Sequence, residues 1–308
     1  MTFTLFPDTR LTLARDALAG LSVGDALGAQ FFIPGRSAAS WRDDLPPGPW
    51  AWSDDTEMAC SVVTVLAHSG EIDRDALATA FADRYDPARR YGAGAVEILE
   101  LIRVGTPWPV AAASAFDGQG SCGNGAAMRV APLGAWYADS IRRAADQARA
   151  SAEVTHAHPE GIAGAVAVAV AASLAARARL DGDRPAPARL LGAVAAALDP
   201  AGEVHRGVRR AVALLGHPAG EVVAALGNGS RVTAQDTVPF TLWVAATHLD
   251  DYLAAIRVCV EAGGDVDTTA AIVGGVVAAY TGVGLPGGVP EGWLAAREPL
   301  PSWLPTPA

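Results

Sequence analysis

The sequence predicts an almost entirely α-helical fold, and three observations support that prediction. Alanine dominates the chain, apolar residues recur three and four positions apart over long segments, and no segment alternates apolar and polar residues as a half-buried strand does. With 308 residues, of which 51% are hydrophobic and 18% charged, the chain is able to bury a full core. We therefore expect a single compact domain of orthogonally packed helices over residues 1–308.

Helices and loops alternate along this predicted domain. The apolar spacing predicts helices over residues 75–85, 141–153, 161–180, 188–198 and 208–215. Stretches rich in proline, glycine and aspartate predict loops over residues 34–49, 86–90, 105–109, 117–125, 181–187 and 285–308. None of these loops has the composition of a flexible linker, and no regular repeat divides the chain, so solenoid folds are not expected.

Charge, cysteine content and hydropathy exclude several classes of protein. The 23 basic residues, all of them arginine, face 33 acidic residues, so no broad basic patch for nucleic acid is expected. Three scattered cysteines and an opening segment without signal-peptide features fit a cytoplasmic protein. Of two uncharged stretches, residues 161–176 are shorter than the about 20 residues of a membrane span, and residues 268–290 contain many glycines and two prolines. Both stretches predict buried core helices and no membrane segment.

A first cluster of oxygen-bearing side chains lies directly before the apolar segment 58–67. It comprises Ser53, Asp54, Asp55 and Thr56, followed by Glu57. Ser53 is a suitable N-cap, which would place both aspartates in the first turn of a helix, where carboxylates complement the helix dipole. The cluster is therefore either an acidic helix start and no more, or one half of a cation site.

A second cluster, Gly263-Gly264-Asp265-Val266-Asp267-Thr268-Thr269, lies directly before the apolar segment 270–280. Two carboxylates one residue apart, with hydroxyls beside them, are the hard oxygen ligands that Mg²⁺ or Mn²⁺ prefers, although a polar helix cap is an equal alternative. If the two helix starts converge, there are enough ligands for two metal ions: Ser53, Asp54, Asp55, Asp265, Asp267 and Thr268. Four acids gathered without cations repel one another, so their convergence would itself indicate bound metal.

Two further segments are candidates for ligand binding. Residues 116–125 contain four glycines, which leave backbone N–H groups free, and a helix beginning after Gly125 would direct its positive end at phosphate oxygens. The glycines are not spaced as in a P-loop or a Rossmann fingerprint, so a plain glycine-rich connection is the alternative. His156 lies in the segment 155–159 between two expected helices, where it is a helix cap, a polar contact to a ligand or a metal ligand.

The order of these segments resembles the ADP-ribosylglycohydrolase superfamily, which includes the dinitrogenase-reductase-activating glycohydrolases and the serine-ADP-ribose hydrolases. The resemblance covers most of the chain, through residues 20–28, 53–56, 90–94, 121–132, 155–156 and 265–271. It implies an all-α fold with a dinuclear metal cleft, whose two Mg²⁺ or Mn²⁺ ions are held by Ser53, Asp54, Asp55, Asp265, Asp267 and Thr268. It also implies that His156 contacts the distal part of the substrate, that Phe116 stacks on adenine, and that a diphosphate lies in the loop of Gly120, Ser121, Cys122, Gly123, Asn124 and Gly125.

Two residues depart from the pattern of that family. A glutamate that serves the serine-specific branch as a mobile, metal-linked catalytic residue corresponds here to Phe32, and a tyrosine that completes an adenine sandwich corresponds to Cys122. The first departure leaves Asp54 or Asp55 as the residue expected to accept the proton of a metal-bound water, with Glu57 as a further possibility. The second departure predicts a looser grip on adenine.

The resemblance implies metal-dependent hydrolysis of the glycosidic bond at the distal ribose of ADP-ribosylated proteins or ADP-ribose derivatives. One alternative is a relative that binds ADP-ribose but has lost turnover, which Phe32 would explain. Another is a haloacid-dehalogenase-type phosphatase, since residues 265–269 match its DxDxT pattern, but that motif belongs after a strand near the start of an α/β domain. We therefore expect an ADP-ribosyl hydrolase, whose linkage the sequence leaves open.

Overall fold

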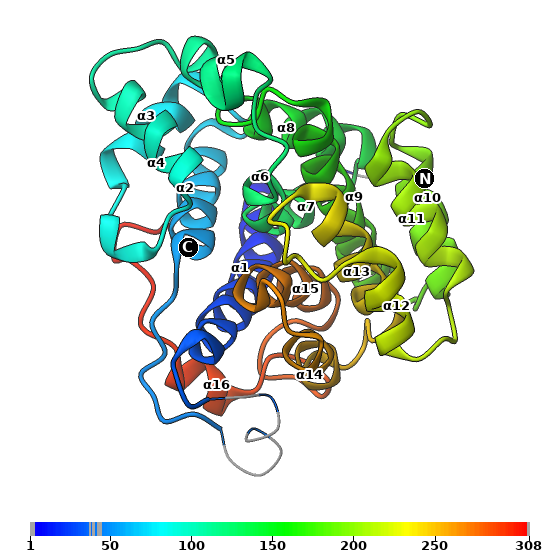
Figure 1. Cartoon of the computed structure of the whole chain (residues 1–308). Coiled ribbons are helices and arrows are strands. Elements are labelled where there is room, and N and C mark those ends of the chain that lie inside the picture. Colours follow the sequence, from blue (N-terminus) through cyan, green and yellow to red (C-terminus); the bar gives the residue numbers. More distant parts are fainter. Residues whose placement is uncertain (1–3, 37, 39–40, 42–44, 307–308) are drawn as a thin grey trace.

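The chain folds into an assembly of helices, which the computed structural model describes for residues 4–36, 38, 41 and 45–306 (Figure 1). Within these described residues no strand occurs, and β pairing is limited to isolated bridges, which confirms the predicted all-α class. In chain order the elements are α1 (Pro7–Gly28), η1 (Ala29–Phe32), α2 (Asp54–Ser69), α3 (Arg74–Arg84), η3 (Pro87–Arg89), α4 (Ala93–Arg103), α5 (Trp108–Gly118), α6 (Gly125–Met128), α7 (Ala131–Trp136), α8 (Ile141–Glu153), α9 (Pro159–Asp181), α10 (Pro187–Ala196), α11 (Glu203–Ala213), α12 (Ala219–Leu226), α13 (Ala234–Thr247), α14 (Tyr252–Ala262), α15 (Val266–Thr281) and α16 (Glu291–Ala296).

The five helices predicted from apolar spacing are present as α3, α8, α9, α10 and α11, with α8 matching its prediction at both ends. Four predicted loops are wrong in part: residues 285–308 contain α16, residues 105–109 contain the start of α5, residues 117–125 contain its end, and residues 86–90 contain η3. Portions of the loops predicted over residues 34–49 and 285–308 lie outside the described residues. Short helices such as α16 escape a search for periodicity because six residues complete fewer than two turns.

Helix α9 is longer than the uncharged stretch that marked it. It begins with Pro159 in its first turn and ends at Gly182, whose left-handed backbone terminates the helix. At 23 residues the whole helix is long and apolar enough to cross a membrane by length and composition, although the uncharged stretch 161–176 within it is not. However, 78% of its most apolar window is buried, which is the property of a core helix.

Helices α1 and α15 run side by side through the middle of the fold because small residues let their backbones meet (Figure 1). A Cβ atom added to Gly20 or Gly24 would lie 2.3 or 2.1 Å from a backbone oxygen of α15, and one added to Gly28 would lie 2.7 Å from the Cα atom of Asp267. Any larger side chain at these positions would force the helices apart. This contact fixes the start of α15 against the end of α1.

Candidate active site

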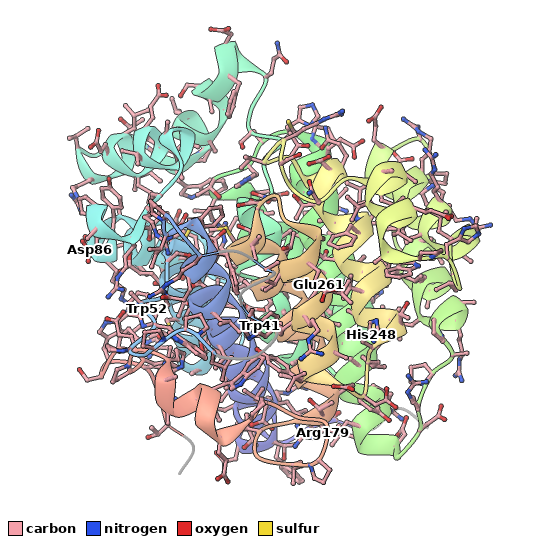
Figure 2. All side chains as sticks on the ribbon, turned by 60° about the horizontal axis from the view of Figure 1, so that its bottom comes forward. Trp41, Trp52, Asp86, Arg179, His248 and Glu261 are labelled. Carbon is pink, nitrogen blue, oxygen red and sulfur yellow. The ribbon has the colours of Figure 1, made fainter. Side chains whose placement is uncertain are left out.

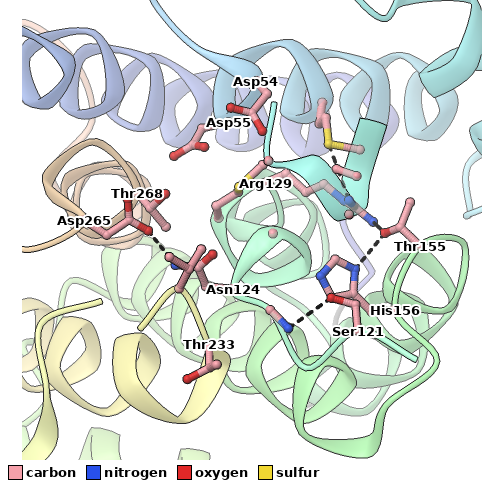
Figure 3. A pocket seen from close by; sticks show the side chains of 18 of the residues that line it. Asp54, Asp55, Ser121, Asn124, Arg129, Thr155, His156, Thr233, Asp265 and Thr268 are labelled. Atoms are coloured by element: carbon pink, nitrogen blue, oxygen red, sulfur yellow. Dashed lines mark hydrogen bonds between the residues drawn. The ribbon is translucent and has the colours of Figure 1, made fainter. Parts of the chain in front are cut away.

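The predicted site residues line one cavity of about 470 Å³ that is bounded by the starts of α2 and α15 and by the loop before α6 (Figure 3). The structure therefore brings the two acidic helix starts, the glycine-rich loop and the histidine together. Ser53 and Gly120 lie next to this lining but are not part of it. The predicted residues that line the cavity are Asp54, Asp55, Phe116, Ser121, Cys122, Gly123, Asn124, Gly125, His156, Asp265, Asp267 and Thr268.

The start of α2 is held from inside by Asp25, a fully buried carboxylate of α1. Asp25 accepts hydrogen bonds from the backbone N–H and the hydroxyl of Ser53, at 2.9 and 2.7 Å, and from those of Thr56, at 3.2 and 2.5 Å. It thereby satisfies backbone donors that a helix start otherwise leaves without partners. Ser53 is the N-cap, as predicted, although its Oγ lies 3.4 Å from the N–H of Asp55.

Asp55 is a buried acid and Asp54 a partly exposed one, and neither has an ion-pair partner in the described part of the chain. Asp55 is 2% exposed, and its Oδ2 has no hydrogen-bond partner among the described residues. Burial raises the pKa of both carboxyls well above the usual range, and the charges of Asp25 and Asp267 raise it further. An orphaned buried oxygen beside repelling carboxylates is an environment that a bound cation relieves.

The start of α15 is built on two glycines instead of a buried acid. Gly263 and Gly264 have left-handed φ angles of 64° and 75°, and a Cβ atom on Gly264 would lie 2.4 Å from the carbonyl oxygen of Asn228. After this turn α15 begins at Val266, so Asp267 lies within its first turn. The helix thus begins about one turn before the apolar segment 270–280.

The two acids of α15 have different partners. The side-chain amide of Asn124 donates a hydrogen bond of 2.7 Å to Asp265 Oδ2, which links this helix start to the glycine-rich loop. The backbone N–H of Thr268 donates to Asp267 Oδ1 at 2.9 Å. Burial, followed by the charges of Asp265 and Asp25, raises the pKa of Asp267 to about 8.

The donor set fits hard cations in its chemistry but does not form a closed cage. Carboxylate and hydroxyl oxygens are the ligands that Mg²⁺ and Mn²⁺ prefer. Across the described residues, however, no three carboxylate, imidazole or thiol side chains converge closely enough to form a metal site. Ser53 is the least suited predicted ligand, since it does not line the cavity and its hydroxyl donates to Asp25. The two acidic walls therefore face one cavity without closing on each other.

The glycine-rich loop forms another wall, but three of its N–H groups already have partners. The Gly120 N–H donates to the carbonyl of Ala115 at 2.9 Å. The Gly123 N–H donates to Ser121 Oγ at 3.1 Å, and the Asn124 N–H donates to a carbonyl of the loop between α12 and α13, also at 3.1 Å. The prediction of free backbone donors is therefore wrong for these three residues. Gly120 does not line the cavity. A Cβ atom added to Gly120 would lie 2.7 Å from the backbone nitrogen of His158, in the segment between α8 and α9. Helix α6 begins at Gly125, as predicted, but has only four residues.

Phe116 lines the cavity with a ring that is 60% exposed. Phe116 and Asp117 have left-handed φ angles of 55° and 56°, which break the helical backbone near the end of α5. This conformation costs free energy in residues other than glycine, and it places the Phe116 ring against Gly94. Cys122 lines the same cavity and offers a thiol where a second ring would be needed to sandwich adenine.

His156 lies beside the glycine-rich loop and is 6% exposed. Burial and, to a smaller extent, the charge of Arg129 lower the pKa of His156 to about 3, so the ring is neutral at physiological pH. The role of helix cap belongs to His158, whose Nδ1 accepts a hydrogen bond of 3.1 Å from the Glu160 N–H at the start of α9. His156 is thus left to contact a ligand in the cavity.

Glu57 and Phe32, the other residues considered for catalysis, do not line the cavity. Glu57 Oε2 accepts hydrogen bonds from the Tyr91 hydroxyl at 2.7 Å and from the Asp86 N–H at 3.2 Å, so it anchors the loop between α3 and α4. Phe32 is half exposed at the end of η1. The aromatic ring therefore does not fill the reaction space, and Asp54 and Asp55 are the acids of α2 that face it.

The loop anchored by Glu57 carries Arg90 to the cavity in a left-handed conformation, with φ at 66°. Its other anchor is Arg89, whose guanidinium lies 3.3 Å from the ring centre of Trp52 and donates to both carboxylate oxygens of Glu298. Figure 2 shows Trp52 and Asp86, a residue near the start of this loop, on the same side of the molecule. A strained residue held from both sides is typical of functional loops. Arg90 thus adds a positive charge to a cavity lined by acids.

Sequence patterns did not identify four residues that shape this site, namely Asp25, Arg90, Arg129 and Thr155. The signal for Asp25 and Arg129 was a lone charge within a run of small and apolar residues, because such charges are buried only with partners. Arg90 and Thr155 lie in the segments 90–94 and 155–156, which carry the family resemblance, but nothing in the sequence indicated their contacts.

Comparison with known proteins identifies the family. A sequence profile of the ADP-ribosylglycohydrolase family matches residues 7–306, which is nearly the whole chain. The chain therefore belongs to the ADP-ribosylglycohydrolase family, which confirms the resemblance seen in its motifs. It is accordingly an enzyme of the ADP-ribosyl hydrolase class.

Individual relatives agree with this assignment. The chain is 29% identical to the ADP-ribosylhydrolase ARH3 of Homo sapiens, over 94% of this chain and 90% of that protein. It is 27% identical to the ADP-ribosylarginine hydrolase Tri1 of Pseudomonas putida, over 94% of this chain and 76% of that protein. A solved structure described as an ADP-ribosylglycohydrolase-related protein complex superposes with a TM-score of 0.65 at 27% identity, covering 94% of this chain and 93% of that chain.

Proposed function

We propose that this enzyme hydrolyses the glycosidic bond at the distal ribose of ADP-ribosylated proteins or ADP-ribose derivatives, with two Mg²⁺ or Mn²⁺ ions as cofactors. One observation carries the proposal: a single cavity is lined by the carboxylates of two helix starts, by an exposed aromatic ring and by a glycine-rich loop. Figure 3 shows acids of both helix starts on the walls of this cavity. Its volume of about 470 Å³ lies in the range of small-ligand sites.

The chemistry of the walls supports one orientation of the ligand. Phe116 offers an exposed face on which adenine stacks, and the loop of residues 121–125 takes the diphosphate. Arg90 and Arg231 in the lining supply positive charge to the phosphates. The distal ribose then reaches the acids of α2 and α15, with His156 as a polar contact.

Asp54, Asp55, Asp265, Asp267 and Thr268 would hold the two cations, with Ser53 as a further ligand if its hydroxyl keeps a lone pair free. When bound, the cations orient the ribose hydroxyls and lower the pKa of a bound water. Asp54 or Asp55 would accept the proton of the attacking water and return a proton to the leaving group as its bond to the anomeric carbon breaks. The surrounding carboxylates would stabilise the oxocarbenium-like charge that develops at that carbon. Asp55 is suited to this role because its Oδ2 has no partner among the described residues.

The surroundings of the second acidic cluster do not support the phosphatase alternative. Helix α14 and a glycine turn precede Asp265, whereas a DxDxT nucleophile follows a strand, and the described chain contains no strand.

The three cysteines are free, which supports the proposal that the enzyme works in the reducing cytoplasm.

The test is a substrate panel with seryl, arginyl and acetyl linkages to ADP-ribose, each incubated with Mg²⁺, Mn²⁺ or a chelator. We expect release of ADP-ribose from at least one linkage, dependent on metal. Binding of ADP-ribose without release from any linkage would indicate a relative that has lost turnover and would contradict the proposal.

The placement of adenine has its own test. Phe116→Ala should weaken the binding of ADP-ribose by about 1 to 3 kcal/mol, the contribution of one stacked base. The matched control is Phe6→Ala, which removes an exposed ring that lies before α1. Equal thermal shifts by ADP-ribose in the wild type and in Phe116→Ala would refute the stacking assignment.

A further inference from the structure

Arg129 is a buried cation, 1% exposed, and no aspartate or glutamate among the described residues forms an ion pair with it. Its Nη2 donates to the carbonyl of Ser151 and to Thr155 Oγ1, both at 2.9 Å, and its guanidinium lies 4.5 Å from the ring centre of Phe81. Burial of a charge without a counterion is costly, so a guanidinium kept in this position indicates a role beyond packing.

The contact between Arg129 and Thr155 determines the direction of the next hydrogen bond. A guanidinium only donates, so Thr155 Oγ1 accepts from it and keeps its own proton to give. Thr155 is 1% exposed, and its hydroxyl lies 2.8 Å from His156 Nδ1. If Nδ1 carried a proton, the hydroxyl would receive two donors and its own proton would be buried without an acceptor. The Thr155 hydroxyl therefore donates to His156 Nδ1.

The hydrogen bond that His156 Nδ1 accepts determines which nitrogen of the ring carries the proton. In a neutral imidazole whose Nδ1 accepts, the proton sits on Nε2. The low pKa of His156 keeps the ring neutral, and Arg129 is the charged group that acts on it among the described residues. The Nε2 atom lies beside the glycine-rich loop, since a Cβ atom added to Gly123 or Gly125 would be 3.5 Å from it. No hydrogen bond of the described residues engages this nitrogen.

We propose that Arg129 and Thr155 are positioning residues that hold His156 as a neutral ring with its Nε2–H available as a hydrogen-bond donor to a ligand in the cavity (Figure 3). The identity of that ligand rests on the proposed function, whereas the tautomer does not. Because Nε2 only donates and the lone pair of Nδ1 is occupied, His156 does not act as the general base. Proton acceptance is thus left to the carboxylates of α2.

The tautomer is measurable in the full-length protein without any ligand. Nitrogen-15 NMR correlations of the His156 ring should show a protonated Nε2 and an unprotonated Nδ1, unchanged between about pH 5 and pH 8. A wild-type ring protonated at Nδ1, or one that titrates near the ordinary histidine pKa, would overturn the proposal whatever the enzyme hydrolyses.

Thr155→Val removes the hydroxyl and keeps nearly the same volume. The His156 signals should then show a mixture of tautomers, and the dissociation constant of ADP-ribose should rise about tenfold, as expected for one lost hydrogen bond. Thr155→Ser should restore both readouts. The matched control is Thr241→Val, which removes another buried hydroxyl, one that donates to the Val238 carbonyl of α13 at 3.0 Å, and it should leave both at wild-type values.

The outcomes separate this proposal from the function on which its ligand depends. A tautomer that Thr155→Val leaves intact would overturn the positioning role, even if ADP-ribose binds well. The expected tautomer in a protein that fails to bind ADP-ribose would support the positioning role and overturn both the ligand assignment and the proposed function.

Discussion

The two acidic helix starts that share the cavity are held in place in opposite ways. The start of α2 is fixed by a side chain, the buried carboxylate of Asp25, which accepts from both Ser53 and Thr56. The start of α15 is fixed by backbone geometry at two left-handed glycines, and its acid Asp265 is bonded to Asn124 of the glycine-rich loop. One acidic wall is therefore part of the core, while the other is coupled to the loop proposed to bind the ligand.

This difference predicts that substitutions in the two walls affect different properties, namely the stability of the fold and the binding of ligands. A change on the α2 side alters a buried network and is expected to reduce the stability of the whole fold. A change on the α15 side alters a contact at the edge of the cavity and is expected to affect binding more than stability. Each of the following substitutions tests one side of this comparison.

The largest effect is expected for Asp25→Ala. The substitution leaves the four donors of Ser53 and Thr56 without their acceptor in a buried place, which should lower the free energy of unfolding by about 3 kcal/mol or more. Denaturant titration measures this loss. The control on the same helix is Asp16→Ala, which breaks a partly exposed ion pair with Arg179 and should cost at most about 1 kcal/mol. Equal stabilities of the two variants would contradict the role of Asp25.

A smaller effect is expected for Asn124→Ala, on the other wall. The substitution removes the 2.7 Å hydrogen bond to Asp265, so the affinity for ADP-ribose and that for Mn²⁺ should both fall about tenfold. Calorimetric titration measures both affinities, and the free energy of unfolding should change less than in Asp25→Ala. If stability falls as much as in Asp25→Ala while both affinities persist, the proposed coupling between loop and acid is wrong.

The smallest effect concerns pH and the metal-free protein. The pKa of Asp267 is raised to about 8, and those of Asp54 and Asp55 are raised well above the ordinary value, so the folded state binds protons more tightly than the unfolded state. The stability that Asp267 contributes is complete below about pH 4 and is lost as the pH rises through about 8, and Asp54 and Asp55 act in the same direction. In chelator, the melting temperature should therefore fall over this window, and Mg²⁺ should reverse the fall near neutral pH. A melting temperature that rises steadily with pH in chelator would contradict the raised pKa values of these acids in the metal-free protein.

The sequence predicted the fold well where the physical rule is local. The 3.6-residue spacing of apolar side chains depends only on near neighbours, so α8 was placed at both ends from the sequence. Helix α16 was missed because six residues at the end of a proline-rich tail carry too little periodicity. The all-α class follows from the same local rule, repeated along the chain.

The candidate site was predictable in its ligand-bearing side chains but not in its supports. Asp54 and Asp267 were recognisable as candidates because each stands in a cluster of oxygen-bearing side chains directly before an apolar segment, although an acidic helix start produces the same pattern. The contact of Asp25 with Ser53 spans 28 positions, and no local pattern encodes it. The same holds for the Asn124 N–H, which looked free in the sequence but bonds to a distant loop. The Gly123 N–H bonds to the side chain of Ser121, only two residues earlier, a local contact that the expectation of free donors overlooked.

The central claim is that the two acidic walls together bind a pair of divalent cations, and calorimetric titration of Mn²⁺ into chelator-treated protein tests it most directly. The account predicts that the wild type binds two ions, and that Asp54→Ala on one wall and Asp267→Ala on the other each abolish metal binding while circular dichroism shows unchanged helical content. Unchanged affinity and stoichiometry in both variants would contradict the account.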